Sequence, residues 1–81
     1  MEEYYKEIYA FEKNKSTKTI VSIKEYKNFK YIDIREMLVK DGREFPTKKG
    51  ITIPLTKVGE MITAFETAEF IINKDLKGET K

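Results

Sequence analysis

The sequence predicts an α+β fold in which an antiparallel β-sheet is followed by a single C-terminal helix. Apolar and polar residues alternate through residues 18–39, which is the two-residue period of half-buried strands. Two turn sequences, Lys27-Asn28-Phe29 and Asp41-Gly42, divide this region into hairpins. After Pro54 the apolar residues change to the spacing of three and four residues that is typical of a helix.

The first expected element is a short strand at about residues 7–12. Tyr9 and Phe11 alternate there with smaller or polar residues, and aromatic residues weakly favour a strand, although the same stretch also has apolar residues at helical spacing. We expect the first residues, about 1–5, to be loose.

Two paired strands are expected next, after a turn at Asn14-Lys15-Ser16. In residues 18–26 one face is formed by Thr19, Val21 and Ile23. In residues 30–39 the apolar side is formed by Ile32, Ile34 and Leu38. This pattern predicts an antiparallel hairpin with one buried and one polar face.

The fourth strand is the least regular in sequence. Asp41-Gly42 is a strong hairpin signal, but Pro46 has no N–H to donate to a neighbouring strand. Residues 43–50 are therefore expected to form an edge strand or a loop before the strand resumes at residues 51–53. Lys48 and Lys49 would then lie in a basic segment at the rim of the sheet.

The helix that starts near Leu55 has an unusually wide apolar face, and its last residues, about 74–81, are expected to be loose. We treat residues 1–81 as a single domain, because a chain of 81 residues buries only a small core. The chain has no Cys and no His, which excludes disulfides and the usual zinc ligands as additional stabilisation. We therefore expect a homodimer formed through the helix, with contacts at Val58, Met61, Ile62, Phe65 and Ala68.

Composition excludes several classes of function. Without His, Cys or a glycine-rich phosphate loop the chain has little material for catalysis, so we expect no enzyme, cofactor or metal site. Asp33 and Glu36 would lie on opposite faces of a strand, and Asp33 beside Arg35 predicts a surface ion pair worth at most about 1 kcal/mol. No apolar run spans a membrane and the start lacks a signal peptide, which predicts an intracellular protein of the cytoplasm or, in a bacterium, the nucleoid.

Charge and aromatic residues favour a nucleic-acid ligand. The net charge is only +2, but residues 18–50 contain nine Lys and Arg against five Asp and Glu. Around the first hairpin turn, aromatic rings able to stack on unpaired bases accompany lysines able to neutralise phosphates: Tyr26, Phe29 and Tyr31 with Lys24, Lys27 and Lys30. The alternative is that the rings pack within the sheet and the lysines are merely solvated.

The segment SIKEYKNFKYIDIREMLVKDGREFPTKKGITIPL, residues 22–55, resembles the transcriptional coactivator PC4 family, including its small bacterial and phage relatives. The resemblance is carried by IDIRE at residues 32–36 and KKGI at residues 48–51, followed by a C-terminal helix. It implies a curved four-stranded antiparallel sheet and one helix, dimerisation through the helices, and binding of single-stranded DNA or melted duplex.

The same resemblance implies roles for individual residues: base stacking by Tyr26 and phosphate contacts by Lys27, Arg35, Lys48 and Lys49. The chain departs from the family at Met37 and Leu38, where relatives often carry aromatics that include a base-stacking tryptophan. Phe29 or Tyr31 would have to substitute for that ring.

We therefore expect a sequence-tolerant single-stranded DNA-binding homodimer that serves as a PC4-like transcription or replication cofactor. The expected nucleic-acid contacts are Lys24, Tyr26, Lys27, Phe29, Lys30, Arg35, Lys48 and Lys49. The alternatives are an RNA ligand, or a dimeric module that binds a polymerase or replication factor and has only incidental affinity for nucleic acid.

Overall fold

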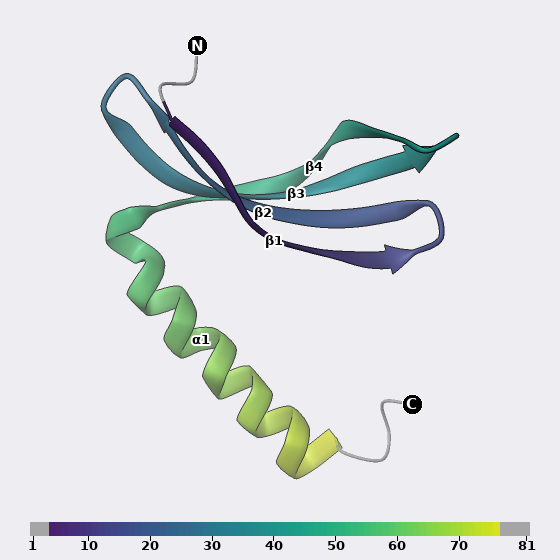
Figure 1. Ribbon diagram of the computed structural model, residues 1–81. Helices are drawn as coiled ribbons and strands as arrows, with labels where there is room; N and C mark the ends of the chain where they lie inside the picture. The colour runs from purple at the N-terminus through teal and green to yellow at the C-terminus, as the bar shows by residue number, and fades with distance from the viewer. Residues whose placement is uncertain (1–3, 77–81) are drawn as a thin grey trace.

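The computed structural model describes residues 4–76, which form a four-stranded antiparallel sheet followed by a helix, as predicted (Figure 1). The strands are β1 (Tyr4–Asn14), β2 (Thr17–Tyr26), β3 (Phe29–Lys40) and β4 (Arg43–Pro54). They lie in the sheet in chain order, so each strand pairs with its neighbour in sequence. A 3₁₀ turn (Leu55–Lys57) leads into α1 (Val58–Ile71), and a π-helical turn (Ile72–Leu76) follows it.

Local sequence explains the three hairpin turns. Lys27 and Asn28 have φ values of 51° and 65°, and Asp41 and Gly42 have 53° and 77°. Positive φ at both central residues is what a two-residue hairpin turn requires, and Asn, Asp and Gly tolerate it best. In the first turn the Asn14 side-chain oxygen accepts hydrogen bonds from the backbone N–H groups of Ser16 and Thr17, each at 2.9 Å.

The first strand is longer than predicted, and residues 43–50 follow the edge-strand alternative. Tyr4 and Tyr5, which were expected to be loose, lie opposite Glu25 and Lys24, because β2 is long enough to pair with them. Residues 43–50 form a continuous strand with residues 51–53 rather than a loop, and Pro46 is accommodated at the edge of the sheet. The expected loose ends at residues 1–3 and 77–81 lie outside the described residues, whereas residues 74–76 belong to the π-helical turn.

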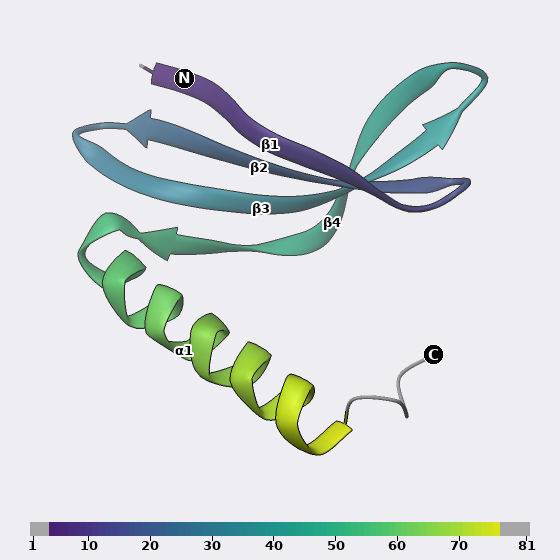
Figure 2. The same ribbon diagram turned by 60° about the horizontal axis from the view of Figure 1, so that its bottom comes forward.

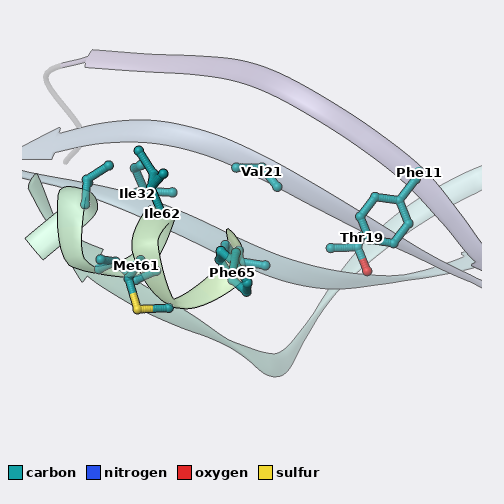
Figure 3. Close-up of a pocket in the computed structure, with 10 residues that line it drawn as sticks. Phe11, Thr19, Val21, Ile32, Met61, Ile62 and Phe65 are labelled. Atoms are coloured by element: carbon teal, nitrogen blue, oxygen red, sulfur yellow. The ribbon is translucent and has the colours of Figure 1, made fainter. Parts of the chain in front are cut away.

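The register gives the sheet two unlike faces. Val21 lies opposite Ile34, and Ile32 opposite Ile53, so these apolar side chains share one face, which we call the helix face. The helix face and the start of α1 line an apolar cavity of about 420 Å³ (Figure 3). The opposite face, which we call the outer face, carries Ile20, Ser22, Lys24, Asp33 and Arg35.

The helix covers little of the sheet. It leaves β4 and runs away from the strands, as the two ribbon views show (Figures 1 and 2). Val58 and Met61 are half-buried, whereas Ile62 and Phe65 are exposed, although all four line the cavity. Within the described chain, the buried apolar side chains are Ile20 and Ile53. No helix between residues 4 and 76 combines the length and apolar character needed to cross a membrane.

Candidate nucleic-acid interface

The centre of the outer face holds a charged cluster around Asp33. Arg35 Nη2 donates to Asp33 Oδ1 at 2.7 Å, and Arg35 Nε donates to Asp33 Oδ2 at 3.4 Å. Lys24 Nζ lies 3.6 Å from the same carboxylate. Asp33 is only 3% exposed, so the predicted ion pair with Arg35 exists but is not a surface pair. Neighbouring strands cover the carboxylate, and two cations compensate for its burial.

Arg35 is fixed on a second side by β4. Its Nη1 donates to the carbonyl oxygen of Thr47 at 3.2 Å. The hydrogen bond with Asp33 raises the pKa of Arg35 above its usual value, with a further contribution from the negative charge of Asp33 and an opposing one from burial. A guanidinium has five N–H donors, so three bonds to protein leave two N–H groups for a ligand.

Gly50 provides the space in which Arg35 lies. A Cβ atom at position 50 would be 2.6 Å from the backbone oxygen of Ile34 and 2.8 Å from Arg35 Cζ. Any larger residue would displace the guanidinium or the strand. The glycine after the two lysines is therefore explained by close contact with Arg35 rather than by a turn.

Lys48 and Lys49 lie in a bulge of β4. Gly50 is opposite Arg35 and Pro46 is opposite Met37, so residues 47–49 all lie across from the single residue Glu36. The Thr47 hydroxyl stabilises this bulge by donating to the Glu36 carbonyl oxygen at 2.7 Å and accepting from the Lys49 N–H at 3.1 Å. Both lysines are exposed, and neither forms an ion pair with another residue of the described chain.

The hairpin between β2 and β3 forms the aromatic end of the outer face. Tyr26 lies opposite Phe29, and the Phe29 and Tyr31 ring centroids are 5.8 Å apart. The Lys27 ammonium is 5.4 Å from the centroid of the Tyr26 ring. Tyr26 and Phe29 are exposed, so their rings are accessible to a planar ligand.

Most of the predicted contact residues therefore share one surface, but Lys49 and Lys30 do not. Lys49 lines a depression of the helix face together with Thr19 and Ile34. Lys30 lies opposite Glu25, with its ammonium 3.4 Å from the Glu25 carboxylate, on the side of the sheet that carries Ile23. The alternation of the strand places Lys30 on the opposite side from Tyr31. The sequence analysis did not identify Thr47 and Gly50 as residues that position Arg35 and the bulge. A glycine within a strand often marks a close backbone contact, so Gly50 could have been recognised.

A comparison with sequence models of protein families identifies the family of the chain. The sequence model of the family described as Transcriptional Coactivator p15 (PC4) matches residues 13–64. The chain belongs to the PC4 family. The matched region runs from the end of β1 into the first half of α1, so it contains the Asp33 cluster, the bulge and the aromatic hairpin of this PC4-family chain. A comparison with curated protein sequences finds no match.

Solved structures of PC4 homologs share the fold. The tetragonal crystal form of a PC4 homolog from Burkholderia pseudomallei is 27% identical, with a TM-score of 0.73 over 82% of this chain and 98% of that one. Its orthorhombic form is 26% identical, with a TM-score of 0.74 over 83% and 92%. A bacteriophage T5 homolog implicated in recombination-dependent DNA replication is 18% identical, with a TM-score of 0.58 over 89% and 82%, which supports the fold alone.

Proposed function

We propose that this PC4-family protein binds single-stranded DNA without strong sequence preference and acts as a homodimeric cofactor in transcription or replication. The observation that carries the proposal is the bulge of β4, which presents two exposed lysines next to Thr47, whose carbonyl oxygen accepts a hydrogen bond from the guanidinium of Arg35. This is a concentration of positive charge on a fixed backbone, as phosphate binding requires.

The geometry supports separate roles for the two kinds of side chain: the charged groups would bind phosphates and the aromatic rings would stack on bases. Arg35 on the outer face, together with Lys48 and Lys49 in the bulge at the edge of the sheet, would hold phosphates. Lys27 would hold a further phosphate at the hairpin, where Tyr26 stacks on a base and Phe29 assists it. Stacking on aromatic rings is tolerant of base identity and needs unpaired bases, which favours a single strand over a closed duplex.

The shape of the protomer supports a dimer. Its accessible surface is 6798 Å², against about 5,100 Å² expected for a compact protein of its mass. Its radius of gyration is 15.2 Å, against about 12 Å expected for its length. Ile62 and Phe65 are more than half exposed beside an apolar cavity, and a second copy packed against α1 would cover them.

A salt titration with labelled oligo-dT tests the proposal. Four phosphate contacts per protomer predict that log affinity falls with log salt at a slope of about −2.8, since each contact on a single strand contributes about 0.7. Affinity should therefore fall by about 50-fold between 50 and 200 mM salt. Equal affinity for duplex and single strands, or no binding, would contradict the proposal. An oligo-rU titration in parallel measures any preference for RNA.

The proposed dimer is tested by a separate measurement. Molecular mass in solution, determined with and without a short oligonucleotide, should correspond to two chains in both samples. A single-chain mass in both would rule out the dimer without affecting the salt result.

A further inference from the structure

β1 contributes no residue to the proposed site, yet it contains more aromatic residues than any other strand. In β1, Tyr4, Tyr5, Tyr9 and Phe11 are 47%, 51%, 65% and 51% exposed. A group of exposed rings of this size is typical of a surface that binds a partner or a ligand.

A bulge in β1 distributes these rings between the two faces of the sheet. Glu7 lies opposite Ser22 and Tyr9 opposite Val21, so Ile8 has no partner residue on β2. Before the bulge, Tyr5 lies opposite Lys24 and therefore on the outer face. After the bulge, Tyr9 lies on the helix face, and so does Phe11, which contributes to the apolar cavity. Tyr5 is thereby separated from the other rings of its strand.

Tyr5 lies at the end of the charged row on the outer face. The Lys24 ammonium is 5.7 Å from the centroid of its ring, and Lys24 in turn contacts Asp33, which binds Arg35. A depression of about 130 Å³ is lined by Tyr5 together with Ser22, Lys24, Asp33 and Arg35. The row crosses from β1 to β3 and ends at Arg35, whose guanidinium bonds to the Thr47 carbonyl on β4.

Tyr31 lies on the outer face of β3, close enough to Arg35 to contribute to its raised pKa, but it does not line this depression. On β3 the next residue of that face after Arg35 is Met37, which lines the same depression. On β4 the facing residues are Gly50 and Pro46. Tyr5 is therefore the aromatic side chain of this depression, and half of its surface is open to a ligand.

We propose that Tyr5 is a base-stacking residue, which receives an unpaired base from a strand whose phosphates lie along Lys24 and Arg35. This inference rests on the proposed single-strand binding and extends the interface across the sheet to its first strand. A ring next to a cation suits a nucleotide, because the base stacks while the ammonium attracts the adjacent phosphate.

Two labelled strands with the same backbone separate stacking from charge: oligo-dT and an abasic strand of equal length. Tyr5→Leu should weaken oligo-dT binding by about 5- to 150-fold, which is the contribution of one stacked base. Affinity for the abasic strand and the salt slope should stay unchanged, because the phosphate contacts remain. Tyr9→Leu, on the same strand but the other face, is the control and should change neither.

A second variant reads out stacking directly. The chain contains no tryptophan, so Tyr5→Trp introduces a single tryptophan at the proposed contact, which can be excited at a wavelength that the remaining tyrosines do not absorb. Its emission should be quenched by saturating oligo-dT and unaffected by the abasic strand, whereas Tyr9→Trp should respond to neither.

Three results would overturn the inference. In the first, the wild type binds oligo-dT but Tyr5→Leu binds it equally well. In the second, Tyr5→Leu loses affinity for both strands alike. In the third, the Tyr5→Trp emission is unchanged at saturation. A wild type that binds neither strand would instead refute the proposed function itself, and the role of Tyr5 with it.

Discussion

Replacing Gly50 with alanine should disrupt both the sheet and the proposed phosphate site. The new Cβ would lie 2.6 Å from the Ile34 carbonyl oxygen, which belongs to the backbone and cannot move without distorting the β3–β4 pairing. It would also lie 2.8 Å from Arg35 Cζ and so push the guanidinium away from Thr47. Overpacking of this kind costs about 1–3 kcal/mol. Losing a hydrogen bond from a charged donor costs about 1.5–3 kcal/mol, less here because Arg35 is partly solvated.

We therefore expect Gly50→Ala to lower the free energy of unfolding by about 2–4 kcal/mol. The melting temperature of a domain this small should fall by about 4–8 °C for each kcal/mol. Thermal unfolding followed by circular dichroism, at one fixed protein concentration, measures the change. Gly59→Ala is the matched control, because a Cβ there meets nothing within 4 Å in the protomer. It should stabilise the helix by up to about 1 kcal/mol.

The binding assay gives the second half of this prediction. At a temperature well below its melting point, Gly50→Ala should bind oligo-dT more weakly than the wild type, because Arg35 no longer lies beside the bulge. A melting temperature within about 2 °C of the wild type would refute the claim that the space at position 50 is closed. Weaker binding without any change in stability would refute the link between packing and the site.

Three further predictions concern the bulge, the helix and a turn. Replacing both Lys48 and Lys49 with Glu should reduce oligo-dT affinity by more than about 100-fold. The melting temperature should stay nearly unchanged, since both side chains are exposed. A loss of affinity of under about tenfold would exclude the two lysines as phosphate ligands. Phe65→Glu should convert the two-chain mass into a single-chain mass in sedimentation analysis, because a charge would enter the proposed interface. Asn28→Val should cost about 1–2 kcal/mol in chemical denaturation, because a β-branched residue tolerates the φ of 65° poorly, whereas Asn28→Gly should cost almost nothing.

The central hairpin and the helix could be predicted because their signals are local. Val21 and Ile23, and likewise Ile32 and Ile34, occupy alternate positions, and that spacing alone places each pair on one face of its strand. Asn28 and Gly42 occupy turn positions whose positive φ values restrict the choice of residue. The basic segment of the site was visible for the same reason, because Lys48 and Lys49 are adjacent in the sequence.

The site itself required pairing between distant segments. Asp33 was predicted as half of a surface ion pair, but its burial depends on the strands on either side of it. The role of Gly50 depends on which residue of β3 lies across from it. Neither the burial of Asp33 nor the partner of Gly50 can be derived from the alternation of apolar and polar residues within one strand. That alternation is the same for an edge strand and a central one.

The bulges of β1 and β4 are the features of this sheet that depend most on tertiary structure. The sequence by itself determined that β1 contains aromatic residues at alternate positions and that β4 contains two lysines before a glycine. Only the folded sheet decided that Ile8 is skipped, which places Tyr5 on the outer face and Tyr9 on the other, and that residues 47–49 share one partner. The physical reason is that strand register is set by the sum of many weak contacts between neighbouring strands, and a shift of one residue exchanges the two faces.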